Sequence, residues 1–321
     1  MEVAVLALVA GLDRAAAAGV AARLVGPGTA LVAYDLRDGI RRTLRVDGTA
    51  GAHLLSGHCA SCALRADLAM LADAFDRLVV HLDPLLEPGP IARELPVTAV
   101  VSVLDDDWLA AATGDDLVDG DRTVAQVAVG HAEAADLLVL HGALDLRTRA
   151  VLDRLAAPVR RVHAMQVAPD LLDGVRHAPV DEVFGPLLRG QPPLSAEAGV
   201  QVVTFRARGP FDPRRLDDAL DVLLHGVVRA RGRLWMASRP DEVLLLESAG
   251  GGLALSPVDT WLAASDDWGA AAPHRRARAA MDWHPAWGDR VQELAVITHA
   301  ADPDRITRAF TEAVEHERTA L

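Results

Sequence analysis

The chain of 321 residues contains no lysine and no asparagine, so all 32 of its basic residues are arginine. Without lysine, the chain lacks the ammonium group that usually reaches the β- and γ-phosphates of a nucleotide from a glycine-rich loop. Without asparagine, it lacks the Asn-Lys pair that reads a guanine base. The absence of these two residue types therefore argues against the common forms of nucleotide binding.

Long apolar segments are also missing, because no stretch of about 18 apolar residues runs without a charge. The first residues, "MEVAVLALVAGLDRAAAAGV", lack the basic start of a signal peptide. We therefore expect no membrane association and a cytoplasmic location. The net charge of −13 repels a phosphate backbone at long range, which argues against direct DNA binding.

Cysteine is scarce: Cys59 and Cys62 are the two in the chain, in the segment "GHCASCALRADL" at residues 57–68. The spacing leaves three interpretations open: part of a zinc site, a redox couple, or two buried thiols. His58 is adjacent, His53 lies one short loop earlier, and His81 is expected at the carboxyl end of a neighbouring strand. Zinc prefers four sulfur or nitrogen ligands. Cys59 and Cys62 are therefore the candidate metal ligands, with His58, His53 and His81 as candidates to complete the site.

The succession of apolar runs predicts the fold. Helical segments alternate with strand-like runs, which is typical of a doubly wound parallel sheet in an α/β domain. The expected strands cover residues 3–10, 29–36, 40–46, 77–82, 97–104 and 135–142. A segment rich in proline and glycine at 185–199 predicts a domain boundary, with one domain at 1–190 and another at 191–321. The second domain is expected to be α+β, with an antiparallel sheet and helices on one face.

Four segments of the second domain carry a resemblance: "FRARGPFDPRRLDDAL", "GVVRARGRLWMASRP", "ESAGGG" and "WGDRVQELAVI". They resemble the C-terminal domain of the CobW-like GTPases, a family linked to metal delivery and zinc homeostasis. The resemblance implies a degenerate P-loop-type domain followed by a smaller CobW C-terminal domain. Of the phosphate-binding loop, Gly11 and Gly19 remain, but alanines replace the lysine and the Ser/Thr. His141 and Gly142 stand where the family has Asn-Lys, and Asp145 comes one position late.

Further segments, "VVHLDPLLEPGPI" and "RTVAQVAVGHAEAADLLVL", together with C-x-x-C in place of C-x-C-C, resemble one actinobacterial branch of that family. This branch comprises the ribosome hibernation factor-recruiting GTPases (MRF). The resemblance implies a stress response to zinc limitation, with zinc sensed at Cys59 and Cys62 and a hibernation factor recruited to the small ribosomal subunit. We therefore predict a zinc-responsive adaptor that has no catalytic residues and binds no GTP. The alternative is a GTP-hydrolysing zinc metallochaperone of the CobW type.

Overall fold

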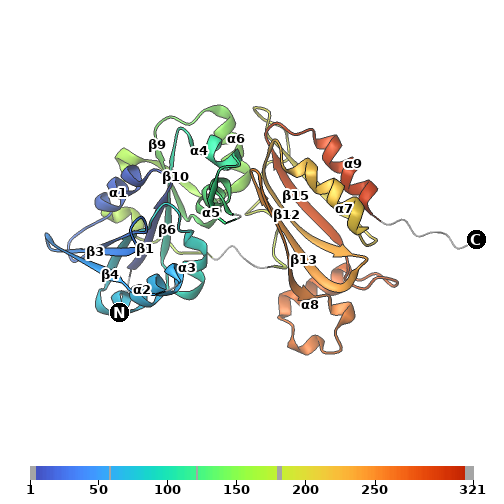
Figure 1. Cartoon of the computed structure of the whole chain (residues 1–321), viewed down its shortest axis with the longest axis horizontal. Coiled ribbons are helices and arrows are strands. Elements are labelled where there is room, and N and C mark those ends of the chain that lie inside the picture. The colour runs from blue at the N-terminus through green and yellow to red at the C-terminus, as the bar shows by residue number, and fades with distance from the viewer. Residues whose placement is uncertain (1–4, 58, 121, 179–182, 315–321) are drawn as a thin grey trace, which may run out of the picture. The chain divides into compact units, whose positions relative to one another are not determined.

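The structure is a computed structural model that describes residues 5–57, 59–120, 122–178 and 183–314. Its residues form two compact units (Figure 1). The first unit lies within residues 1–111, 127–148 and 158–180. The second lies within residues 112–126, 149–157 and 181–321. Two short segments of the amino-terminal half therefore belong to the second unit. The boundary expected between residues 190 and 191 stays a prediction.

The first unit is built on an eight-stranded sheet. In spatial order its strands are β10 (Arg160–His163), β9 (Leu137–His141), β6 (Ala99–Asp105), β1 (Val5–Gly11), β5 (Arg77–His81), β2 (Ala30–Asp35), β3 (Ile40–Val46) and β4 (Thr49–Leu55). The six strands from β10 to β2 are parallel, which confirms the predicted fold class. The apolar runs of the central strands are buried because helices cover both faces of a parallel sheet.

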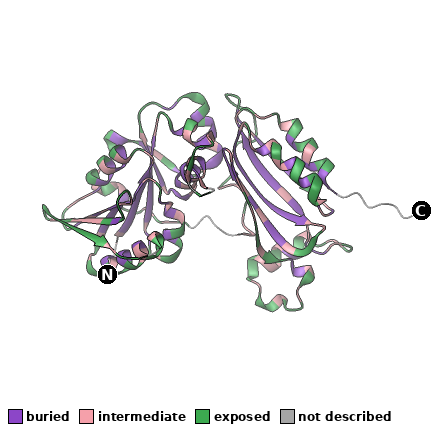
Figure 2. Ribbon diagram, in the orientation of Figure 1, coloured by how far each residue is buried: buried purple, intermediate pink, exposed green. Residues whose placement is uncertain are grey.

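The last two strands of this sheet form an antiparallel hairpin, β3–β4, next to β2. The chain between β2 and β3 is too short for a parallel crossover, so β3 returns antiparallel. The sequence does not predict β4, because "TAGAHLL" shows no apolar alternation. All its residues except Leu55 are exposed, as the green strand at the sheet edge in Figure 2 shows.

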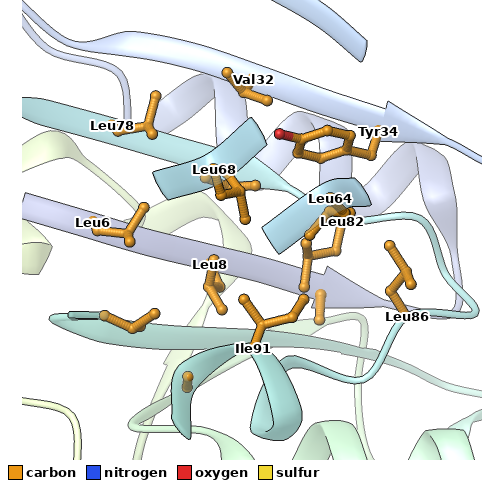
Figure 3. Packing of buried hydrophobic residues seen from close by; sticks show 14 of the residues in the cluster. Leu6, Leu8, Val32, Tyr34, Leu64, Leu68, Leu78, Leu82, Leu86 and Ile91 are labelled. Atoms are coloured by element: carbon orange, nitrogen blue, oxygen red, sulfur yellow. The ribbon is translucent and has the colours of Figure 1, made fainter. Parts of the chain in front are cut away.

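Helices pack on both faces of the first sheet. The helices and short strands of the amino-terminal half are α1 (Arg14–Arg23), α2 (Ala60–Ala74), α3 (Pro88–Glu94), α4 (Trp108–Thr113), β7 (Leu117–Asp119), β8 (Arg122–Thr123), α5 (Val124–Ala134), α6 (Leu146–Leu155), η1 (Ala164–Gln166) and η2 (Pro169–Leu172). On one face, Leu64 and Leu68 of α2 pack against the leucines of β1 and β5 (Figure 3). On the other, Ala17, Val20 and Ala21 of α1 pack against the sheet. Because α1 is rich in alanine, it packs on the sheet with mostly small side chains.

The second unit contains a five-stranded antiparallel sheet with helices, as predicted. Its strands in spatial order are β11 (Gln201–Ala207), β15 (Gln292–Thr298), β12 (Val227–Met236), β13 (Arg239–Ala249) and β14 (Gly252–Thr260). Its helices are α7 (Pro213–Leu220), η3 (Asp221–Leu223), η4 (Leu262–Ala264), η5 (Trp268–Ala270), α8 (Pro273–Asp282) and α9 (Pro303–Ala313). Phe205, Phe211 and Phe310 pack ring against ring in its core, at centroid distances of 5.9–6.2 Å.

None of the helices in the described part of the chain is long and apolar enough to cross a membrane.

Candidate metal centre

The two cysteines lie at the start of α2. Cys59 is the N-cap of this helix, and its Sγ accepts a hydrogen bond from the backbone N–H of Cys62 at 3.2 Å. Both thiols are unoxidised and exposed, so they do not form part of the core. Hydrogen bonds from the side chain and the backbone of Cys62 lower the pKa of Cys59. The fold thus favours the thiolate at Cys59, which is the form of cysteine that binds metal and reacts as a nucleophile.

A guanidinium lies beside this pair. Arg65, one helical turn after Cys62, places its Nη2 at 3.6 Å from the Cys62 Sγ. The same side chain forms an ion pair with Glu94 on α3 and donates to the carbonyl oxygen of Ser61. Arg65 is therefore held near the sulfurs, where its positive charge contributes to the lowered pKa of Cys59.

The three candidate histidines differ in position. His53 is exposed on the edge strand β4, opposite Arg42 of β3. His81 is the last residue of β5; it is buried, and its Nε2 has no hydrogen-bond partner. Burial, and then the nearby charge of Arg14, lower the pKa of His81, so its imidazole is neutral at pH 7. His58 lies outside the described residues.

No group of three or more His, Cys, Asp or Glu side chains that could hold a metal ion occurs among the described residues. The structure therefore brings Cys59 and Cys62 together, but it does not place His53 or His81 with them as a third ligand. The assignment of the metal ligands remains a prediction. What the geometry supplies is an exposed pair of sulfurs at a helix N-terminus, which is two of the four ligands that a zinc site requires.

The two glycines of the degenerate nucleotide loop lie in regular elements: Gly11 ends β1, and Gly19 lies in α1. β1 ends at Gly11 and α1 begins at Arg14, so two residues, Leu12 and Asp13, connect them. A loop of the G-x-x-x-x-G-K type needs more residues to wrap its backbone around phosphates. Gly11 also packs tightly, since a Cβ there would lie 2.9 Å from the carbonyl oxygen of Val103. Gly19 lies inside α1 with open space around it.

The N-terminus of α1 already carries a negative charge of the protein itself. The Asp13 Oδ1 accepts hydrogen bonds from the backbone N–H groups of Ala15 at 2.8 Å and Ala16 at 3.1 Å. These N–H groups are the ones that a helix start offers to a bound anion. The Arg14 guanidinium pairs with the buried Asp83 at 2.5 Å and lies 3.7 Å from Asp35. Both features that could attract a phosphate here are therefore used internally.

The residues in the guanine-reading positions have local roles as well. Gly142 has a φ of +121°, a backbone conformation that is strained for a residue with a side chain such as lysine. Asp145 caps α6 by accepting the N–H of Thr148 at 2.6 Å, and this hydrogen bond lowers the pKa of the carboxyl. His141 ends β9 and is exposed.

With this architecture described, the comparisons with known proteins define the class. Residues 200–314 match the model of the "Cobalamin synthesis protein cobW C-terminal domain". This range covers the five-stranded antiparallel sheet and helices α7 to α9. The chain therefore carries a CobW C-terminal domain, which follows the α/β sheet unit of the preceding residues.

Two mycobacterial proteins show to which family the chain belongs. The chain is 42% identical over 289 residues to "Zinc chaperone Rv0106" of Mycobacterium tuberculosis and to "Uncharacterized protein Mb0109" of Mycobacterium bovis. Each match covers 80% of this chain and 72% of the relative. The chain belongs to the family of these mycobacterial proteins.

Two further matches are more distant. The chain is 28% identical over 114 residues to "Zinc-regulated GTPase metalloprotein activator 1" of Dictyostelium discoideum, covering 33% of this chain and 23% of that protein. Among solved structures, Zn(II)-bound YjiA GTPase from E. coli matches with a TM-score of 0.41 and 15% identity. That match covers 98% of this chain and 100% of YjiA, and a score this low supports no conclusion about function.

Proposed function

We propose that the chain is a zinc-responsive adaptor, which binds zinc through Cys59 and Cys62 and recruits a hibernation factor to the small ribosomal subunit. The observation that carries this proposal is the exposed cysteine pair at the start of α2. One thiol is held by a backbone N–H, and its pKa is lowered. The pair lies at the surface, where a metal ion or a partner reaches it without any change in the core.

The relatives support the zinc part of the proposal. One mycobacterial relative is named a zinc chaperone, and the Dictyostelium relative is named a zinc-regulated activator of metalloproteins. A zinc-related role of CobW type is thus the general function that we infer. The recruitment of a hibernation factor rests on the resemblance of the sequence to the actinobacterial branch.

Two sulfurs alone suit a sensor better than a permanent zinc site. Bound zinc would be held by the Cys59 and Cys62 thiolates, and its remaining positions would be filled by His58, by water or by a partner. An incomplete set of protein ligands binds zinc less tightly than four cysteines do, so the ion is released when its supply falls. Arg65 adds a positive charge close to the sulfurs, which further weakens the binding of a divalent cation.

The start of α1 argues for an adaptor rather than a GTPase. Hydrolysis of GTP needs cations that offset the phosphate charge and a group that orients water. Here Arg14 is paired with Asp83, and Asp13 occupies the helix N-terminus. A triphosphate placed there would meet carboxylates. The alternative, a GTP-hydrolysing zinc metallochaperone, requires this local arrangement to open.

Zinc titration against a chromophoric chelator tests the metal site. We expect about one equivalent of zinc per chain, lost in Cys59→Ser and in Cys62→Ser because each removes one of the two sulfurs. Ser61→Ala, which lies between the cysteines and leaves both thiols in place, is the matched control and should bind normally. If both cysteine variants keep the full equivalent of zinc, the proposed site is wrong.

Co-sedimentation with purified small ribosomal subunits tests the adaptor role. We expect the hibernation factor to pellet with the subunits when this chain is present, and a chelator to change the amount that pellets. Cys59→Ser should remove the response to the chelator. Recovery of the factor that does not depend on this chain would contradict the proposal. A thermal shift with Mg²⁺ and GTP at micromolar concentration would favour the metallochaperone.

A further inference from the structure

A cavity lies between α1 and the sheet, where it is lined by residues of β2, β3 and β5. Its volume is about 420 Å³, within the range of small-molecule sites. Ala15, Ala18 and Ala22 of α1 form one wall, and Leu31 and Ala33 of β2 form the floor. Because the helix presents alanines here, the space that larger side chains would fill is left open.

Four polar side chains line the same cavity: His81, Arg45, Thr43 and Arg14. His81 at the end of β5 is 6% exposed, and its Nε2 has no hydrogen-bond partner. A buried polar atom without a partner is uncommon in native proteins and points to a missing ligand or water. Arg45 on β3 lines the cavity and forms no ion pair with any residue that the structure describes. Thr43, two residues earlier on the same strand, adds a hydroxyl.

The charges around the cavity select the kind of anion. Arg14 also lines it, but the guanidinium is paired with Asp83 and lies near Asp35. Asp35 is also paired with Arg37 at 2.5 Å, and neither carboxylate lines the cavity. Arg45 is therefore the lining guanidinium that forms no ion pair with any residue that the structure describes. A single negative charge can pair with Arg45 alone, whereas a multiply charged phosphate needs further cations that the described lining does not supply.

We propose that this cavity binds a small monocarboxylate, whose apolar part lies along the alanines of α1, whose carboxylate pairs with Arg45 and whose polar atoms meet His81. The alanine wall and Leu31 take a hydrocarbon or aromatic body, and the 420 Å³ volume has room for it. This site is separate from the cysteine pair and does not rest on the zinc function. A result that contradicts the zinc proposal therefore does not affect the proposed carboxylate site, and the reverse also holds.

Ligand-observed NMR with 4-phenylbutyrate tests the proposal on the full chain. We expect saturation transfer at millimolar concentration, and binding at least about fivefold weaker for the neutral 4-phenylbutyramide. Arg45→Ala should weaken binding about tenfold, because the charge pair is lost. Arg41→Ala is the matched control. It removes the same charge from the same face of β3 but lies outside the cavity, so it should change affinity less than about twofold.

Two more variants test the position of the ligand. Ala18→Leu fills the cavity and should abolish binding, whereas Gly19→Leu places the same side chain at the next position of α1, where the surroundings are open, and should not. His81→Phe keeps a ring of similar size but removes the polar nitrogens, and should weaken binding about threefold or more. Absence of saturation transfer, equal binding of the amide, or unchanged binding by Ala18→Leu would each overturn the proposal.

Discussion

Tyr34, the single tyrosine of the chain, shows how a buried polar side chain is satisfied in this core. Its hydroxyl donates to Asp67 Oδ2 at 2.6 Å, and Asp67 Oδ1 accepts from Arg42 at 2.6 Å. Burial, and then the hydrogen bond to Asp67, raise the pKa of Tyr34 far above its usual range. The three residues come from β2, α2 and β3, so this network ties the hairpin to the helix that follows it.

We expect Tyr34 to stay un-ionised for as long as the protein is folded. Its pKa is raised in the fold, so the neutral phenol contributes stability that is fully present below the unfolded pKa of about 10 and is lost as the pH rises above it. Absorbance near 295 nm should therefore show phenolate only together with unfolding. Tyr34→Phe should lower the free energy of unfolding by about 1–2 kcal/mol. Ionisation of the folded protein at about pH 10 would contradict this.

The reactivity of Cys59 provides a second test at the scale of one residue. Because its pKa is lowered in the fold by Cys62, alkylation by iodoacetamide should reach half its maximal rate at a pH below the usual value of about 8.5. In Cys62→Ala the side-chain hydrogen bond is lost, so the midpoint should move back up. Mass spectrometry of the labelled peptide measures both rates. A midpoint that does not move in the variant would show that Cys62 has no influence.

At the scale of single elements, the start of α1 and the turns of the hairpins each depend on one or two residues. Two residues separate β1 from α1, and one of them caps the helix, so no open loop remains at this point. The hairpin turns are set by glycines with positive φ. Gly48 joins β3 to β4 with φ +82°, and Gly250 joins β13 to β14 with φ +52°. Of the triple glycine, Gly250 and Gly251 form the turn, and Gly252 begins β14.

These two glycines form a matched pair for measuring the effect of surroundings. At Gly48 nothing lies within 4 Å of an added Cβ, whereas at Gly250 that atom would lie 2.3 Å from the carbonyl oxygen of Gly114. Gly48→Ala should cost about 1 kcal/mol of stability from the positive φ alone. Gly250→Ala should cost about 3 kcal/mol or more, because the backbone must move as well. Urea unfolding measures the difference, and equal costs would show that the turn tolerates the contact.

At the scale of the whole molecule, the second unit uses segments from both halves of the chain. The turn at Gly250–Gly252 packs against residues 114–126, and the N–H of Gly251 donates to the Gly114 carbonyl at 3.1 Å. Arg154, buried on α6, donates to the carbonyl of Ala150 and, with its other nitrogen, to that of Ser195. The CobW C-terminal sheet is therefore supported by residues that a cut at 190/191 would remove.

We expect an isolated fragment of residues 191–321 to fold with less stability than the same residues in the full chain. It lacks segments 112–126 and 149–157, so buried surface around the glycine turn becomes exposed. Tryptophan fluorescence in urea should show a lower midpoint for the fragment. An unchanged midpoint would mean that the second unit is complete without these segments, and would support the boundary at 190/191.

The course of the chain could largely be predicted. Apolar runs such as residues 5–11 and 77–81 form buried parallel strands because they are apolar on both faces. β4 could not be predicted, since "TAGAHLL" becomes a strand through pairing with β3 rather than through its own pattern. For the site, spacing identified Cys59 and Cys62. Their exposure, and the N-cap role of Cys59, depend on where α2 begins.

The sequence by itself determined three features of this protein. It shows that lysine and asparagine are absent, it predicts the alternation of strands and helices, and it identifies the cysteine pair. Those features are local, so a short stretch of chain contains all the information. The pairing of Arg14 with Asp83, 69 residues later, and the cavity beside His81 arise when β1, β2 and β5 come together. Such contacts depend on which strands become neighbours in the sheet, and the folded chain alone shows this.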